Sequence, residues 1–281
     1  MIEIKNLKFH YKKDVTTLEK VTVDIPKGHI YGLLGLNGCG KTTMLKLIAG
    51  TLFPRSGNIT VNGHIPSDRK LDHLSDLYFV TDEVELPNWT VANILSVYAP
   101  LYPKFDIAYF FDILEKFNID NRDNIKGLSY GQRKKVNIAF ALASNVSLLL
   151  MDEPTNGLDI PSKTQFRKLI VQHLTEERTI IISTHQIRDV HHLIDHVLIV
   201  KKHKLLLDAS LFALSEQFIF KQGQFADALY AESHMGGTVS LLPNSKNEDN
   251  PFDIELFFNA IHENPTILNH FDKLKVKQHA G

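Results

Sequence analysis

The sequence of 281 residues contains one cysteine, Cys39, and almost no excess of either charge. A single cysteine excludes a disulfide within the chain and is typical of proteins from a reducing compartment. The 31 lysines and arginines nearly balance the 32 aspartates and glutamates, and the formal net charge is −1. This balance does not indicate a nucleic-acid partner or an anionic membrane surface, and we expect no nucleic acid as a partner.

The apolar runs of the sequence are all short. The longest ones, at 138–144 and 147–151, are far shorter than the roughly 18 residues that a membrane-spanning helix needs. The first five residues alternate apolar and polar side chains and lack the apolar segment of a signal peptide. If the protein serves a membrane, we therefore expect a partner to supply the spanning part.

The order of predicted elements indicates the fold class. Strands alternate with helices along residues 1–208, which predicts an α/β domain with a mostly parallel sheet covered on both faces. Helical spacing dominates residues 83–144 and predicts a helical subdomain there. Residues 209–281 form a predicted C-terminal accessory region, with a helix over 209–230, a strand over 238–242 and a last helix over 253–262.

A glycine-rich loop joins a predicted strand to a predicted helix. It reads Gly35-Leu36-Asn37-Gly38-Cys39-Gly40-Lys41-Thr42 and matches the phosphate-binding pattern G-x-x-x-x-G-K-[ST] at every fixed position. Glycines allow backbone N–H groups to point at an anion, and the helix start adds its positive end. Lys41 supplies a charge for the β- and γ-phosphates, Thr42 a hydroxyl for Mg²⁺, and Thr43 a hydrogen bond to the α-phosphate. The alternative, a plain glycine turn, does not explain the strand–loop–helix context.

Two acids follow a hydrophobic strand at 148–151. Asp152 can hold Mg²⁺ at the carboxyl end of the strand, and Glu153 can orient or deprotonate an attacking water. Taken alone, such a pair is often only a solvated strand end. The phosphate loop favours the functional interpretation.

Further motifs occur in an order that resembles one family. Leu128-Ser129-Tyr130-Gly131-Gln132 closely resembles the signature sequence of ABC ATPases, and it lies upstream of the acidic strand, as in that family. Asn156-Gly157-Leu158-Asp159 resembles the family's D-loop, and Ser183-Thr184-His185 its switch-histidine segment. Tyr11 stands where the family has an aromatic residue that stacks on adenine. The match covers about residues 1–205.

The resemblance implies a P-loop NTPase fold of the ABC type, with an N-terminal antiparallel β subdomain, and a dimer with ATP at its interface. Ser129, Gly131 and Gln132 would then contact ATP held by the opposite subunit. His185 would contact the γ-phosphate and Glu153, and Asp159 would couple the two sites. The implied cofactors are ATP and Mg²⁺.

Two positions depart from the family pattern. The family usually has a glutamine after the strand at 77–80, and we assign that position to Asp82, with Thr81 as the alternative. A carboxylate can still bind Mg²⁺, but it adds negative charge near the phosphates, so hydrolysis is expected to be slower or more dependent on a partner. Tyr130 replaces the usual first glycine of the signature, a change that can tune dimer closure.

Other candidates have simpler interpretations. His191, His192 and His196 are predicted on one helix, with the last two at metal-binding spacing, but no third ligand is evident and surface histidines are the expectation. Cys39 is expected to be a spectator, with redox sensitivity as the alternative. Trp89 either packs the helical subdomain or docks it onto a transporter helix.

The predicted function is an ATP-hydrolysing subunit of an ABC membrane transporter. The expected partners are a separate permease and a second ATPase subunit, identical or related, and the expected location is cytoplasmic, on the inner face of the membrane. Export is favoured over import. The alternatives are a soluble ATPase of the iron–sulfur assembly type and a degenerate scaffold, which the intact Lys41, Asp152, Glu153 and His185 disfavour.

Overall fold

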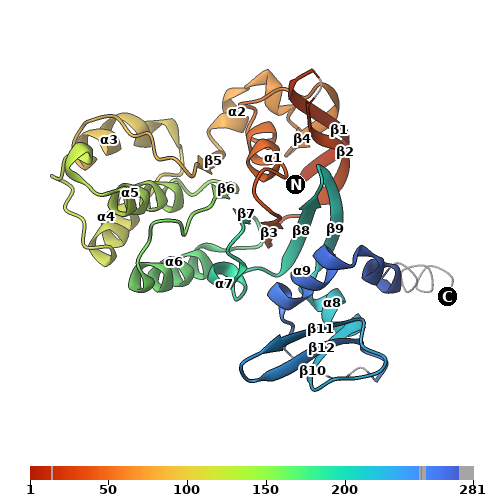
Figure 1. Ribbon diagram of the computed structural model, residues 1–281. Helices are drawn as coiled ribbons and strands as arrows, with labels where there is room; N and C mark the ends of the chain where they lie inside the picture. Colours follow the sequence, from red (N-terminus) through yellow and green to blue (C-terminus); the bar gives the residue numbers. More distant parts are fainter. Residues whose placement is uncertain (14, 247, 249–250, 272–281) are drawn as a thin grey trace. The chain divides into compact units, whose positions relative to one another are not determined.

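The computed structural model describes residues 1–13, 15–246, 248 and 251–271 (Figure 1). The chain divides into two units, one formed by Met1–Ile194 with Leu198–Asp208 and the other by Asp195–Val197 with the chain from Ala209 onward. Within the described residues, no helix is long and apolar enough to cross a membrane.

An antiparallel sheet opens the first unit. Its order is β2 (Val15–Ile25), β1 (Ile2–Lys12) and β4 (Ser56–Val61). Ile2 lies opposite both Ile25 and Val61, and all three are buried, because alternate residues of each strand face the core. This sheet is the predicted N-terminal β subdomain.

A six-stranded sheet carries the site. Its order is β5 (Leu77–Val80), β6 (Leu148–Asp152), β7 (Thr179–Thr184), β3 (Ile30–Leu34), β8 (His196–Lys201) and β9 (Lys204–Ser210) (Figure 1). The first four strands are parallel, and every residue of β3, β6 and β7 is buried, as continuous hydrophobic strands of a covered sheet require. Lys202 and His203 both have positive φ and turn the chain from β8 into β9. The predicted α/β fold is confirmed.

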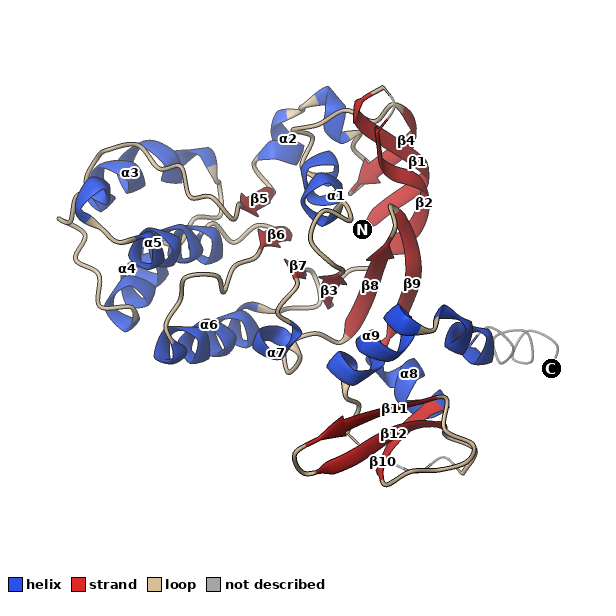
Figure 2. Ribbon diagram, in the orientation of Figure 1, coloured by secondary structure: helices blue, strands red, loops and turns tan. Residues whose placement is uncertain are grey.

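Seven helices are described in this unit. They are α1 (Lys41–Ile48), α2 (Leu71–Leu74), α3 (Val91–Tyr98), α4 (Ile107–Lys116), α5 (Tyr130–Ala143), α6 (Ile160–His173) and α7 (Ile187–Val190), with 3₁₀ turns at Pro66–Asp68, Ala99–Leu101 and Ile125–Gly127. Side chains cap the starts of α3, α4, α5 and α6. Thr90 and Asp106 cap α3 and α4 with their side chains, as predicted. Figure 2 shows α3, α4 and α5 gathered beside the strands without a strand among them.

The helical part has its own aromatic core. The ring of Phe140 on α5 lies 4.7 Å from that of Phe105 and 5.9 Å from that of Phe110 on α4. Tyr78 of β5 packs 5.8 Å from Phe140, so the same cluster joins α5 to the edge of the six-stranded sheet. Such aromatic contacts add to area burial, and they set the position of α5 relative to the sheet.

The second unit has a small antiparallel sheet. Its elements are α8 (Leu211–Gln217), β10 (Phe218–Gln222), β11 (Tyr230–His234), β12 (Gly237–Pro243), α9 (Ile254–Glu263) and a 3₁₀ turn at Pro265–Ile267, and the strand order is β10-β12-β11. The predicted strand at 238–242 and the helix at 253–262 are confirmed. The helix predicted over 209–230 is confirmed only at 211–217, because residues 209 and 210 end β9. Phe218, Ile219 and Phe220 pair with β12 instead, and a short apolar run is compatible with the periodicity of a helix or of a strand.

Candidate functional site

The phosphate loop follows β3 and ends at α1. Gly40 has φ 112°, and a Cβ there would lie 2.8 Å from the carbonyl oxygen of Thr17; at Gly35 it would lie 2.6 Å from that of Val200. Only glycine fits either position. No side chain caps the start of α1, so its first N–H groups are left for an anion. Lys41 donates hydrogen bonds to the carbonyl oxygens of Gly35 (2.8 Å) and Leu36 (3.3 Å), which holds its ammonium over the loop.

The two acids stand at the carboxyl end of β6, and the end of β7 holds them. Asp152 accepts a hydrogen bond from the hydroxyl of Ser183. Glu153 Oε2 accepts from the Thr184 hydroxyl (2.9 Å), and Oε1 accepts from the backbone N–H of His185 (3.0 Å) and lies 2.7 Å from its ring Nδ1. Because a carboxylate only accepts, this contact places the imidazole proton on Nδ1. Both acids are buried, and their orientation is therefore set by the strand ends.

These residues surround one cavity of about 850 Å³. The predicted site residues that line it are Tyr11, Asn37, Gly38, Gly40, Lys41, Thr42, Thr43, Asp82, Asp152, Glu153 and His185. Gly35 and Cys39 belong to the loop but do not line the cavity. The Tyr11 hydroxyl lies 3.2 Å from Thr43 Oγ1 and its ring is half exposed, as a base-stacking platform requires. A glycine cradle, a lysine, a hydroxyl and two carboxylates are the donor set of Mg²⁺ with a nucleoside triphosphate.

The predicted signature turn, residues 129–132, does not line that cavity. Ser129 caps α5 by accepting from the N–H of Gln132 (3.2 Å), while Gln132 Oε1 accepts from the N–H of Ser129 (2.9 Å). A Cβ at Gly131 would lie 2.5 Å from the carbonyl oxygen of Gly157, so the turn packs on the D-loop, residues 156–159. Asp159 also lies outside the cavity and caps α6 through Ser162, whose hydrogen bond lowers the pKa of its carboxyl.

Asp82 has a partner that sequence reasoning missed. Lys134, on α5, has a fully buried side chain and lies 3.0 Å from Asp82 Oδ1. Burial lowers the pKa of Lys134, and Asp82 opposes that shift. Tyr130 donates to the carbonyl oxygen of Asp82 (2.8 Å), and burial together with Asp82 raises its pKa to about 12, so the hydroxyl keeps its proton. The sequence does contain one signal for this pair: Lys134 lies one helical turn after Tyr130 on the apolar face of α5, where a lysine needs a partner.

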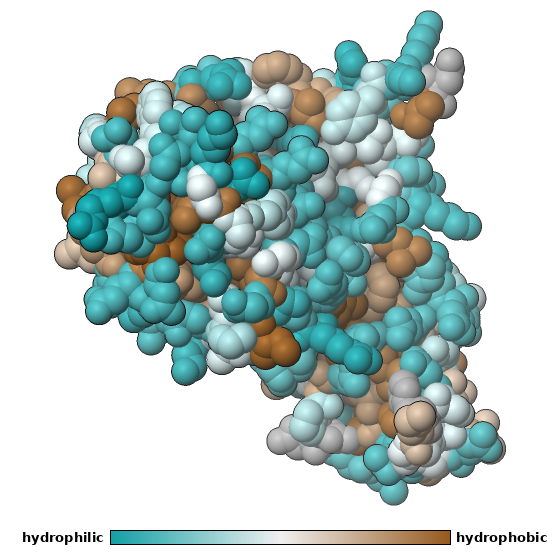
Figure 3. All heavy atoms as spheres, turned by 60° about the vertical axis from the view of Figure 1, so that its left-hand side comes forward, coloured by the Kyte–Doolittle hydropathy of each residue, from teal (hydrophilic) through white to brown (hydrophobic). Residues whose placement is uncertain are grey.

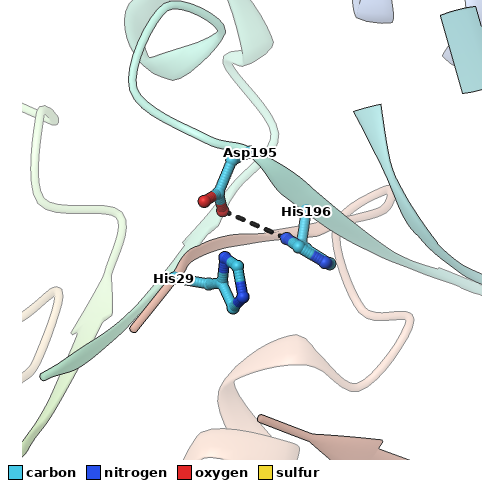
Figure 4. Close-up of side chains that lie close together, drawn as sticks. All are labelled: His29, Asp195 and His196. Carbon is cyan, nitrogen blue, oxygen red and sulfur yellow. Dashed lines mark hydrogen bonds and ion pairs between the residues drawn. The ribbon is translucent and has the colours of Figure 1, made fainter. Parts of the chain in front are cut away.

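Three other predictions have different outcomes. His191 and His192 follow the short helix α7, whereas His196 begins β8 and lies 3.2 Å from Asp195 Oδ1 (Figure 4), so the single helix predicted for the three is wrong. Cys39 is buried, and burial raises the pKa of its thiol. Trp89 is 42% exposed, with its ring 6.4 Å from that of Tyr98; its docking role stays a prediction.

Comparison with known proteins shows the family and the fold of the chain. A family model described as "ABC transporter" matches residues 18–156. The chain is 30% identical over 210 residues to the ABC transporter ATP-binding protein YtrB of Bacillus subtilis (strain 168), which covers 74% of this chain and 72% of that protein. CbiO1 of Clostridium perfringens, whose structure is described as part of the ABC transporter complex cbiONQ, matches with a TM-score of 0.62 and 26% identity over 74% of this chain and 88% of that one. The dimeric structure of MJ0796, a bacterial ABC transporter cassette, matches with a TM-score of 0.67 over 75% of this chain and 99% of that one; at 23% identity it supports the fold alone.

The fold and the site together define a P-loop ATPase. The chain belongs to the ABC transporter family, as an ATP-binding subunit that hydrolyses ATP.

Proposed function

We propose that this subunit drives a separate membrane permease by closing head-to-tail on a second ATPase subunit, with two Mg·ATP at the interface. One observation carries the proposal. The phosphate loop, both acids and His185 line one cavity, while the signature turn lies outside it. Because the signature turn is absent from the cavity of its own chain, the turn of a second subunit would complete the site.

Nucleotide binding falls to the residues of the phosphate loop. Lys41 and the first N–H groups of α1 would hold the β- and γ-phosphates, and Thr43 the α-phosphate. Thr42, Asp152 and Asp82 offer the hard oxygen ligands that Mg²⁺ prefers. When bound, Mg²⁺ neutralises part of the negative charge of the phosphates. Tyr11, at the rim, would stack on the base.

Hydrolysis falls to Glu153 and His185. Glu153 orients and deprotonates the attacking water, since its carboxylate lies at the cavity and is the one that contacts His185. His185 orients Glu153 through Nδ1. With a second proton on Nε2, the same ring would donate to the γ-phosphate. Removal of that phosphate would take away contacts that only the closed dimer makes, so the subunits would separate.

The closed dimer would place Ser129, Gly131 and Gln132 against the γ-phosphate held by the partner, with Asp159 coupling the two sites. All of these residues occur in one chain, so two copies of it would form two working sites. A related ATPase is the other candidate partner, and residues 209–281 would be an accessory region.

Permease docking would use a groove on the helical part. A cavity of about 510 Å³ lies there, and its apolar and aromatic lining includes Phe79, Leu86, Ile94, Tyr98 and Phe140. Figure 3 turns the helical part toward the viewer and shows hydrophobic side chains exposed among hydrophilic ones. A cytoplasmic helix of the permease would fit such a groove. The subunit would then lie in the cytoplasm, on the inner face of the membrane, and export is our preferred direction.

The test is purification of the tagged protein from membranes and identification of what it retains. We expect a protein with several membrane spans, which dissociates when the groove carries Tyr98→Asp. Recovery with iron–sulfur assembly factors and no membrane protein would instead support the alternative function.

A further inference from the structure

Lys134 is a fully buried lysine that the proposed mechanism does not yet use. Its three N–H donors have three acceptors: the carbonyl oxygen of Glu153 at 2.5 Å, Asp82 Oδ1 at 3.0 Å and the Tyr130 hydroxyl at 3.3 Å. A buried ammonium is expensive unless all its donors are satisfied. Two of the three acceptors belong to Glu153 and Asp82, which line the nucleotide cavity, and the third is the Tyr130 hydroxyl beside Asp82.

The bond to Glu153 involves its main chain. Glu153 has φ 44°, in the left-handed region that a glutamate rarely adopts, and such a conformation persists only where surrounding groups hold it. Thr184 and His185 hold the side chain. Lys134 holds the main-chain carbonyl oxygen, so both the side chain and the main chain of Glu153 have partners.

The hydrogen bond from Lys134 to Asp82 also pairs two opposite charges. Asp82 lines the nucleotide cavity, where an unpaired carboxylate would oppose the triphosphate. Lys134 supplies the opposite charge at hydrogen-bond distance, and Asn156 adds a donor at 3.4 Å from the same oxygen. Glu153 and Asp152 also act on the lysine, and they stabilise its charge.

We infer that Lys134 is a positioning residue for ATP hydrolysis, which fixes the main chain of Glu153 and neutralises Asp82 from the helix that begins at the signature turn. The inference rests on the proposed function. It assigns Lys134 two separable effects: the Glu153 contact governs turnover, and the Asp82 contact governs the affinity for Mg·ATP.

The experiment compares Lys134→Met with the double variant Lys134→Met/Asp82→Asn. In the single variant, kcat falls about tenfold or more because Glu153 loses a main-chain partner, and the dissociation constant for a fluorescent Mg·ATP analogue rises about tenfold because Asp82 loses its counter-charge. In the double variant, the asparagine keeps an amide oxygen for Mg²⁺ but carries no charge, so the dissociation constant returns to within about twofold of the original while kcat stays low. A general loss of folding would move both quantities together, so thermal unfolding without nucleotide is recorded for each protein.

Two further variants complete the design. Lys134→Gln keeps a donor for the Glu153 carbonyl but no charge; it is expected to keep kcat within about threefold and to weaken Mg·ATP binding, even if the methionine variant does not fold. Lys116→Met is the control, because Lys116 pairs with Asp112 on the exposed face of α4, and neither quantity is expected to change.

Some outcomes would overturn the inference. A folded Lys134→Met protein with unchanged kcat and unchanged affinity would do so, as would an affinity that Asp82→Asn fails to restore. For Lys134→Gln, a kcat far below that of the Lys116→Met control, together with an unaltered affinity for Mg·ATP, would equally count against the inference. These results differ from failure of the proposed function, in which the unmodified protein would neither form a dimer with Mg·ATP nor retain a membrane protein.

Discussion

Substitution of Gly131 by alanine tests how closely the signature turn and the D-loop must fit. A Cβ at Gly131 would lie 2.5 Å from the carbonyl oxygen of Gly157, whereas an ordinary contact begins at 3.4 Å. The backbone of Gly131 is not in the left-handed region, so alanine brings a steric conflict and no dihedral strain. The two segments must therefore separate by about 0.9 Å, because a packed interior does not absorb such an overlap.

The size of the effect follows from that displacement. A misplacement of about 1 Å costs about a hundredfold in rate where geometry controls the reaction, so we expect kcat to fall about a hundredfold. Gly131 does not line the nucleotide cavity of its own chain, so the dissociation constant of the monomer for Mg·ATP should stay within about twofold. Phosphate release measures the first quantity, and titration with a fluorescent ATP analogue measures the second.

Gly127→Ala is the matched control. It lies four residues before Gly131, its φ is ordinary, and a Cβ there would meet no atom within 4 Å. It should retain full turnover and an unchanged melting temperature. If Gly131→Ala hydrolysed ATP as fast as Gly127→Ala, the packing of the signature turn on the D-loop would have no part in the reaction.

Three more predictions concern Glu153, Lys41 and the buried His173. Glu153→Gln should bind ATP, hydrolyse it about a thousandfold more slowly and accumulate as a dimer; a monomer at saturating ATP, by light scattering, would contradict the head-to-tail model. Lys41→Met should weaken Mg·ATP binding about tenfold or more by calorimetry, since one phosphate-facing charge is lost, and an unchanged affinity would remove Lys41 from the site. Burial, with Arg178 nearby, lowers the pKa of His173 from 6.5 to about 3, so between these values the unfolded chain takes up a proton that the folded chain does not. Stability should therefore fall as pH falls through that window, by up to about 1.4 kcal/mol per pH unit, and urea unfolding of His173→Asn should show a flatter dependence.

Local signals explain which parts of the fold were predictable. Thr90 and Asp106 were predicted as helix caps because a cap depends only on the next three residues. The loop at residues 35–42 was predictable because glycines at fixed spacing allow its backbone N–H groups to point at an anion, and that spacing is visible in the sequence. Strand–helix alternation then led to the mostly parallel sheet.

Non-local partners explain what was missed. The segment at 218–220 becomes a strand only because β12 lies beside it, and a short apolar run gives no hint of that partner. Lys134 looks like one charge among several on α5, and its role emerges only when three elements distant in the sequence meet. The sequence likewise placed Asp82 near the phosphates but did not reveal that a lysine 52 positions later shares its carboxylate.

The single cysteine has a practical consequence. Cys39 is buried in the phosphate loop, and its raised pKa keeps the sulfur in the poorly nucleophilic thiol form. A maleimide dye should therefore not react with Cys39, but should react with a cysteine introduced at an exposed position such as Lys116. Distances between two such dyes, one per subunit, would then report opening and closing in solution with the native loop chemistry left intact.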